Sequence, residues 1–361
     1  MRASSQIFIA LFCWFSFPGF AQQGASPAQV PTLAERPPAV ALPAERRITL
    51  DVVVTDHSGN PVPGLQQQDF TLLDDKQPRT ISSFRASYGT RQAADPPIQA
   101  IVLVDAINTP FRGVAFEREG LGTFLHHDGG ELPLPTSLII LTDKDGGQTA
   151  STQDGNILVD SLDSQQSGLR TITRSQGFYG GMERFQISLE ALDRFISSEA
   201  TQPGRKLLIW LGPGWPLLSG PNVQLSAKDQ DRLFQNVVRL STALREARIT
   251  LYNVNPPGMG NSFAGEFYYE GFLKGVGSAH KVQNGNLALQ VLAAQSGGQV
   301  LNTSNDIADS IARCLVDQKA FYTLTFDSPA AEYPNEYHSL QVKIGRPHLT
   351  ARTRTGYYAQ P

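Results

Sequence analysis

The sequence predicts an α/β fold, in which a doubly wound, mostly parallel sheet is inserted into a small β-sandwich built from both chain ends. Two observations support this prediction. Apolar runs alternate with helical patterns through the middle of the 361-residue chain, and repeated strand–helix units form a parallel sheet with helices on both faces. Groups of short strand-like segments precede and follow that region, and three short strands alone form a poor domain. The two terminal groups are therefore expected to pair with each other.

The N-terminus has the pattern of an export signal. Arg2 precedes a short apolar stretch over residues 7–17, and the small residues Gly19 and Ala21 suit a signal peptidase. We expect residues 1–21 to be removed and the Pro-, Ala- and Gln-rich segment 22–46 to act as a linker. The apolar stretch is too short to span a bilayer as a mature helix. The processed chain is therefore expected to be periplasmic or extracellular, and not transmembrane.

Segment 47–90 is expected to supply the first strands of the sandwich. Apolar residues alternate over Ile48–Val54, and two shorter strands, Phe70–Leu73 and Thr80–Phe84, flank a polar turn at Asp74–Pro78. Each of these strands has too few neighbours within the segment to bury its apolar face.

The missing partners are expected in segment 318–361. Three runs there have the pattern of strands, namely Phe321–Phe326, His338–Ile344 and Leu349–Tyr358. The sandwich would then consist of strands from both ends, with the α/β region inserted between them.

Residues 95–317 are expected to form the α/β domain. The first strand, Ile98–Asp105, is nearly all apolar, which is typical of a central strand buried on both faces of a parallel sheet. Four further apolar runs follow, at Ser137–Leu141, Lys206–Leu211, Ile249–Val254 and Gln299–Leu301.

Helical patterns separate these strands. Apolar residues recur on one helical face from Phe185 to Ile196 and from Leu233 to Leu244. Ser304–Asp306 has the composition of an N-terminal cap for the last helix. Within that helix Cys314 follows the apolar spacing, which predicts a buried thiol.

Composition excludes one class of partner. Thirty Lys and Arg residues against 33 Asp and Glu give a formal net charge of −3, whereas nucleic-acid-binding proteins present a basic stripe. We therefore expect no nucleic-acid partner. Charged residues make up only 17% of a chain with 32 Gly and 24 Pro, which favours a loop-rich extracytoplasmic globule over a disordered chain.

Asp105 marks the expected binding site, because ligands of open α/β sheets bind outside the carboxyl ends of the strands. Asn108 and Thr109 follow it closely in the sequence. Trp215 follows a later strand of the same sheet, and would provide an aromatic anchor for a partner if it were exposed beside Asp105.

With this topology, a strand ending in Asp105 resembles the von Willebrand factor A domain. More narrowly, the chain resembles a family of secreted bacterial proteins with a von Willebrand factor A-related domain. The similarity lies in Val52–Asp56, Asn60–Leu65 and Asp69–Phe70, and in the closing segment Arg352–Tyr358. It covers nearly everything after the linker and implies a binding or adhesion function.

Von Willebrand factor A domains often carry a metal-ion-dependent adhesion site that begins with Asp-x-Ser-x-Ser. The resemblance aligns this motif with residues 105–109, where Asp105 and Thr109 match, Ile107 cannot coordinate a metal, and Asn108 offers an amide oxygen from another position. Mg²⁺ requires several oxygen ligands in octahedral geometry.

Two later segments that contribute ligands to such a site also differ. The loop expected to supply a Thr reads Gly180-Gly181-Met182-Glu183, in which Glu183 could substitute for one ligand. The strand expected to end in Asp-Gly ends in Leu211-Gly212-Pro213. We therefore expect a degenerate site in which Asp105 caps the following turn. The alternative is a remodelled site that holds Mg²⁺ or Ca²⁺ weakly through Asp105, Thr109 and Glu183.

Two functional classes remain. The first is a secreted, non-catalytic binding or adhesion module with a protein partner and no resident cofactor; its candidate ligand-binding residues are Asp105, Asn108, Thr109, Glu183 and Trp215. The second is an extracytoplasmic hydrolase. The sequence shows no nucleophile elbow and no zinc-spaced histidines, although catalytic triads assemble in space rather than in sequence. A deep pocket with converging titratable groups would favour the enzyme. We expect the binding module.

Overall fold

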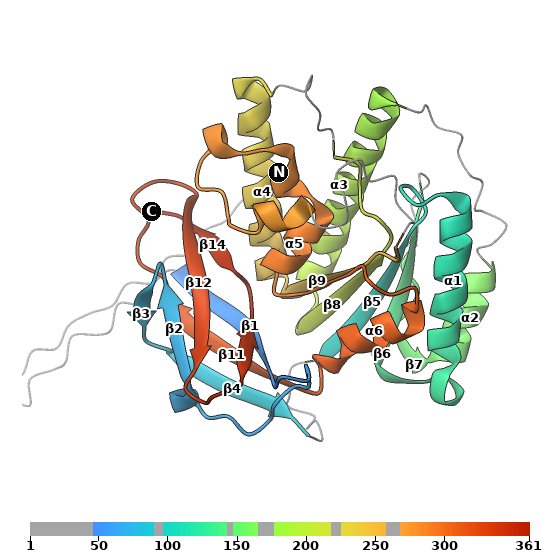
Figure 1. Ribbon diagram of the computed structural model, residues 1–361, viewed down its shortest axis with the longest axis horizontal. Helices are drawn as coiled ribbons and strands as arrows, with labels where there is room; N and C mark the ends of the chain where they lie inside the picture. Colours follow the sequence, from blue (N-terminus) through green and yellow to red (C-terminus); the bar gives the residue numbers. More distant parts are fainter. Residues whose placement is uncertain (1–45, 90–96, 143–146, 165–176, 218–224, 258–267) are drawn as a thin grey trace, which may run out of the picture. The chain divides into compact units, whose positions relative to one another are not determined.

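Three sheets organise the described part of the chain (Figure 1). The computed structural model describes residues 46–89, 97–142, 147–164, 177–217, 225–257 and 268–361. The predicted export signal, and all of the predicted linker except its last residue, lie outside these ranges. Within them, no helix combines the length and the apolar character needed to cross a membrane.

The central sheet has six strands in the order β10-β9-β8-β5-β6-β7. Its neighbouring strands are parallel except for β7, which runs antiparallel to β6. The strands are β5 (Ile98–Asp105), β6 (Glu131–Leu141), β7 (Thr152–Asp154), β8 (Arg205–Leu211), β9 (Ile249–Val254) and β10 (Val300–Leu301). The chain thus builds outward from β5 in one direction through β6, then returns to the other side of β5 with β8. This is the doubly wound order, and its switch point lies between β5 and β8.

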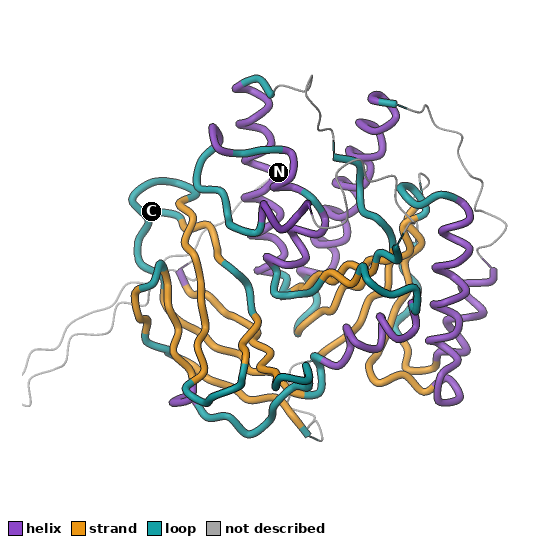
Figure 2. Tube along the Cα trace, in the orientation of Figure 1, coloured by secondary structure: helices purple, strands orange, loops and turns teal. Residues whose placement is uncertain are grey.

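Helices cover both faces of this sheet (Figure 2). One face packs against α1 (Phe111–His126), α2 (Gly155–Ser164) and α6 (Ile307–Val316), and the other against α3 (Phe178–Ala200), α4 (Ala227–Glu246) and α5 (Leu289–Gln295). Strand β5 contributes alternate residues to the two hydrophobic clusters, as the pleat of a fully buried strand requires. The mixed α/β class with a mostly parallel sheet is therefore as the sequence predicts.

The predicted cap of the last helix is present. Asp306 is the N-cap of α6, and its side chain accepts a hydrogen bond from the backbone N–H of Asp309 at 2.8 Å. Cys314 is buried on this helix, and burial raises the pKa of its thiol. Short 3-10 helices lie at Gln67–Asp69, His127–Gly130, Tyr268–Phe272, Ala279–Lys281 and Asn284–Leu287.

Two four-stranded antiparallel sheets contain the terminal segments, with strand orders β13-β1-β11-β4 and β14-β12-β2-β3. Strands from the two ends of the described chain pair directly, β1 with β11 and β2 with β12. Side chains of both sheets share one hydrophobic cluster. The strands are β1 (Arg47–Thr55), β2 (Phe70–Asp74), β3 (Gln77–Arg79), β4 (Ser83–Tyr88), β11 (Ala320–Asp327), β12 (Glu336–Ile344), β13 (Thr350–Arg352) and β14 (Gly356–Ala359).

Two predicted strand boundaries are wrong. The polar segment expected to be one turn contains only a two-residue turn, Asp75-Lys76, whose φ angles of 48° and 67° are positive. Strand β3 follows at once, and its proline is tolerated because β3 is an edge strand. The next strand, expected at Thr80–Phe84, therefore begins only at Ser83.

The closing segment Leu349–Tyr358 is two strands rather than one. β13 pairs with β1 in one antiparallel sheet, whereas β14 pairs with β12 in the other. The chain changes sheet between them, which a sequence pattern of alternating residues does not reveal.

Candidate functional site

Asp105 lies at the switch point of the central sheet, where doubly wound folds bind their ligands. It is the last residue of β5, and β5 pairs with β8 on one side and β6 on the other. The carboxylate is fully buried. Its role therefore depends on the groups that surround it inside the protein.

Four N–H groups satisfy the Asp105 carboxylate. Oδ1 accepts hydrogen bonds from the backbone N–H groups of Ile107 at 3.1 Å and Asn108 at 3.0 Å. Oδ2 accepts from the Asn108 side-chain amide at 2.8 Å and from the Trp210 indole at 3.0 Å. Burial raises the pKa of Asp105, and these hydrogen bonds oppose that rise. The carboxylate thus fastens the turn between β5 and α1 to β8.

Asn108 connects this carboxylate to helix α3. Its side-chain nitrogen donates both to Asp105 Oδ2 and to the hydroxyl of Ser188 on α3, at 2.8 and 2.9 Å. The amide therefore joins a carboxylate to a hydroxyl, two groups that a divalent cation could otherwise bridge. Its own oxygen is buried and has no hydrogen-bond partner among the described residues.

A second carboxylate, Glu117 of α1, lies next to Asp105. Glu117 is also fully buried, and its Oε1 accepts a hydrogen bond from the Thr109 hydroxyl at 3.4 Å. Burial, and then the charge of Asp105, raise the pKa of Glu117 well above its usual range, while the Thr109 hydrogen bond opposes the rise. Glu117 is therefore harder to ionise than an ordinary glutamate.

Gly212, the first residue after β8, packs directly against Thr109 and Asp105. A Cβ at Gly212 would lie 2.8 Å from Thr109 Oγ1 and 2.9 Å from Asp105 Cβ, and the backbone φ of Gly212 is 132°. A side chain at this position would therefore displace both groups. The resemblance leads one to expect a second acidic ligand after this strand, where the chain has Gly212 and Pro213.

This donor set does not fit a divalent cation. N–H groups occupy both oxygens of Asp105, and the Thr109 hydroxyl is directed at Glu117. Ile107 packs into the hydrophobic cluster on the α3–α5 face. A cation would need oxygen ligands at the positions that these groups fill.

The structure brings only some of the predicted site residues together. Asp105, Asn108 and Thr109 lie in one hydrogen-bonded turn, whereas Glu183 is exposed on α3 and the carboxylate beside Asp105 is Glu117 instead. Trp215 does not meet the condition of exposure on which its role as an anchor depended. Its side chain is only 4% exposed and its indole donates to the Leu287 carbonyl at 2.9 Å.

Three residues of the site were missed from the sequence. Glu117 could have been identified from the sequence as a buried acid, because it lies on the apolar face of its helix between Val114 and Leu121. Trp210 lies inside the apolar strand β8, and its contribution is an indole N–H directed at Asp105. Ser188 carries no local sequence signal, since only the packing of α3 against the sheet places it at Asn108.

Exposed apolar side chains lie at the starts of α1 and α3. Phe111 is 58% exposed, Tyr179 81% and Met182 44%. Helix α1 follows the carboxyl end of β5, and α3 precedes the amino end of β8. Both helices therefore begin at the carboxyl edge of the sheet (Figure 1). We call Phe111, Tyr179 and Met182, which lie on two different helices, the edge residues.

Two open hollows on the described surface lie elsewhere. One is lined by residues around β2 and β3, including Phe70 and Arg79, and the other by residues of β12 and β13, including Val342 and Arg352. Neither is lined by Asp105 or Glu117.

Comparisons with known proteins leave the family open. No protein-family model matches the chain, and no curated protein matches its sequence. Among solved structures, it is similar to the human COPII-coat protein Sec24c, with 10% identity and a TM-score of 0.34, over 79% of this chain and 48% of that one. It is also similar to the von Willebrand factor domain of the type V pili tip protein Mfa5 from Porphyromonas gingivalis, with 12% identity and a TM-score of 0.29, over 61% of this chain and 95% of that one. The fold description therefore rests on strand order and packing.

Proposed function

We propose that this chain is an exported, non-catalytic protein-binding module of the von Willebrand factor A type, which binds its partner at the carboxyl edge of the central sheet without a metal ion. The observation that carries the proposal is the state of Asp105. A carboxylate at the switch point of this strand order is where an adhesion site would bind its cation, yet four internal N–H groups satisfy it.

The two buried carboxylates support a structural role over hydrolysis. Asp105 and Glu117 have no measurable solvent exposure, so a substrate could reach them only after the turn that they hold had opened. A general acid or base must come within hydrogen-bond reach of its substrate. The raised pKa of Glu117 is then a consequence of burial beside another acid.

The exposed edge residues support protein binding at this end of the sheet. Aromatic residues are enriched among the side chains that contribute most to binding energy in protein interfaces, and Phe111 and Tyr179 are both exposed here. After export and removal of residues 1–21, the chain would meet its partner in the periplasm or outside the cell.

Site-specific photo-cross-linking tests this face. A photoreactive benzoylphenylalanine at Phe111 is expected to form a discrete adduct with a protein in the native exported fraction. The same residue at Tyr333 is the matched control, because Tyr333 is 49% exposed and lies between β11 and β12 in the antiparallel sheets. Equal adducts at both positions, or none at Phe111, would contradict the proposal.

A further inference from the structure

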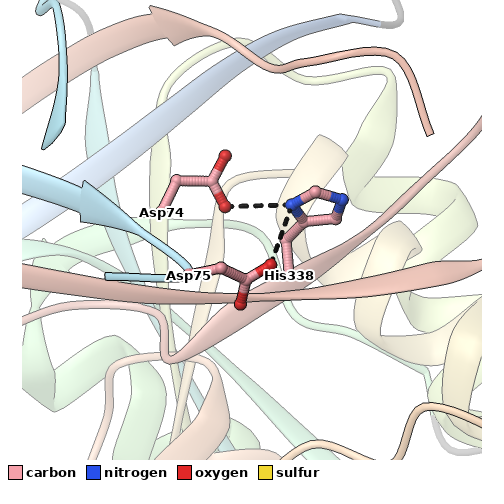
Figure 3. Close-up of side chains that lie close together, drawn as sticks. All are labelled: Asp74, Asp75 and His338. Carbon is pink, nitrogen blue, oxygen red and sulfur yellow. Dashed lines mark hydrogen bonds and ion pairs between the residues drawn. The ribbon is translucent and has the colours of Figure 1, made fainter. Parts of the chain in front are cut away.

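Asp74, Asp75 and His338 lie together where the two ends of the chain pair (Figure 3). Asp74 ends β2, Asp75 is the first residue of the two-residue turn, and His338 lies in β12. The register that pairs β2 with β12 aligns Asp74 with Leu340, and Asp75 donates its backbone N–H to the Ser339 carbonyl at 2.8 Å. Strand pairing therefore fixes the position of all three side chains.

Two carboxylates converge on a single ring nitrogen. His338 Nδ1 lies 3.0 Å from Asp74 Oδ1 and 3.2 Å from Asp75 Oδ2. This nitrogen carries at most one proton, which cannot serve both oxygens well. At metal–ligand distances of about 2.0–2.1 Å, two ligands of a tetrahedral zinc ion lie about 3.3 Å apart. The observed separations are close to that spacing.

The other oxygen of each carboxylate is held by a separate group. Asp74 Oδ2 accepts from the Tyr357 hydroxyl at 3.0 Å and from Arg79 Nε at 3.3 Å. Asp75 Oδ1 accepts from the backbone N–H and the hydroxyl of Ser339, both at 2.8 Å. Outer partners of this kind orient the ligands of metal sites. One oxygen of each carboxylate is therefore directed at His338.

The far nitrogen of His338, Nε2, is buried without a hydrogen-bond partner among the described residues. The His338 side chain is only 9% exposed. The closest carboxylate to it is Glu336, whose Oε2 lies 3.9 Å away. If Nδ1 binds a metal, Nε2 must carry the ring proton, and Glu336 would have to move closer to accept it.

The charge balance favours a cation. Asp74, Asp75 and Glu336 carry three negative charges, and Arg79 offsets one of them. A divalent ion at Nδ1 would place positive charge where two carboxylates face one ring nitrogen. Asp74 is fully buried, whereas the side chain of Asp75 is 51% exposed. An ion could therefore enter from the side of Asp75.

We propose that Asp74, Asp75 and His338 bind one Zn²⁺ ion, with solvent in a fourth position. One imidazole and two carboxylates suit zinc better than Mg²⁺ or Ca²⁺, which prefer oxygen ligands alone. The ion would fasten the β2–β3 turn to β12, and so join the N-terminal strands to the C-terminal ones. This proposal is independent of the function proposed for the carboxyl edge of the central sheet.

Calorimetric titration of the tag-free processed chain with Zn²⁺ tests the site. We expect one ion per chain and a melting temperature that rises with Zn²⁺ concentration, because an ion that binds only the folded state stabilises it. Asp75→Asn and His338→Gln are each expected to weaken binding by at least about 10-fold, the lower bound for losing an outer partner. Asn suits position 75 because it tolerates the positive φ there.

A second His–Asp pair provides the matched control. His127 Nδ1 lies 3.0 Å from Asp128 Oδ2, but both side chains are more than 70% exposed, at 73% and 76%. His127→Gln should leave the affinity unchanged. Zinc uptake that persists at full affinity in Asp75→Asn, that is lost in His127→Gln, or that does not occur in the wild type would overturn the proposal. Asp75→Asn decides the question if His338→Gln does not fold.

Discussion

Replacing Asp105 with alanine is expected to lower the free energy of unfolding by about 3 kcal/mol or more, because it leaves three buried donors without an acceptor and each costs about 1–3 kcal/mol. The change orphans the Trp210 indole and the backbone N–H groups of Ile107 and Asn108. The Asn108 side chain keeps only its bond to Ser188. Urea-induced unfolding of the wild type and the variant measures the difference.

Asp56 provides the control for this substitution. Its Oδ1 also accepts two backbone N–H groups, from Ser58 and Asn60 at 2.8 and 2.9 Å, but it lies in an exposed turn. Water can replace the carboxylate there, so Asp56→Ala is expected to cost much less than Asp105→Ala. Equal losses in the two variants would show that Asp105 does not act as a buried cap.

Replacing Glu117 with glutamine is expected to produce a stability difference that grows with pH. The folded-state pKa of Glu117 lies above its ordinary value of 4.5, chiefly because of burial and then because of Asp105. A raised pKa means that the contribution of this group is fully present below pH 4.5 and is lost as the pH rises towards the folded pKa. Across that interval the wild type should lose about 1.4 kcal/mol per pH unit relative to Glu117→Gln.

Unfolding free energies measured from pH 4 to pH 9 test this expectation. Glutamine retains an oxygen for the Thr109 hydroxyl, so the variant removes the titration while preserving the hydrogen bond. Glu119→Gln controls for loss of a charge from the same helix, because Glu119 is exposed two residues further along α1. A difference between wild type and Glu117→Gln that stays constant with pH would contradict a buried, protonation-sensitive Glu117.

Local sequence patterns predict the strands of the central sheet well. The runs at Ile98–Asp105 and Ile249–Val254 match β5 and β9 to the residue, because strands buried on both faces are marked by continuous apolar sequence. The first and last residues of the short terminal strands were harder to predict. At Asp75-Lys76 two positive φ angles allow a tighter turn than the polar composition suggested.

The candidate site was likewise only partly predictable from the sequence. Asp105, Asn108 and Thr109 are close in sequence, so their shared turn could be anticipated. Trp210 reaches the carboxylate from a neighbouring strand, and Ser188 from a helix on one face of the sheet. Their roles depend on tertiary packing that no local pattern encodes.

The cluster around His338 shows the same limit over a longer distance. Asp74 and His338 are separated by 264 residues and meet because β2 pairs with β12. In the sequence, Asp74 belongs to a polar turn and His338 begins a strand. Neither residue is recognisable as a metal ligand from its local sequence. The cluster forms only when the two ends of the chain pair.

Thermal unfolding of the tag-free processed chain in increasing Mg²⁺ or Ca²⁺, compared with Asp105→Asn, tests whether Asp105 binds a cation or caps its turn without one. A cation bound at Asp105 would raise the melting temperature with its concentration. Because N–H groups of the chain satisfy this carboxylate, we expect no increase for the wild type at millimolar Mg²⁺ or Ca²⁺. A rise that is present in the wild type, retained in His338→Gln and absent in Asp105→Asn would contradict the account and indicate a metal-dependent adhesion site.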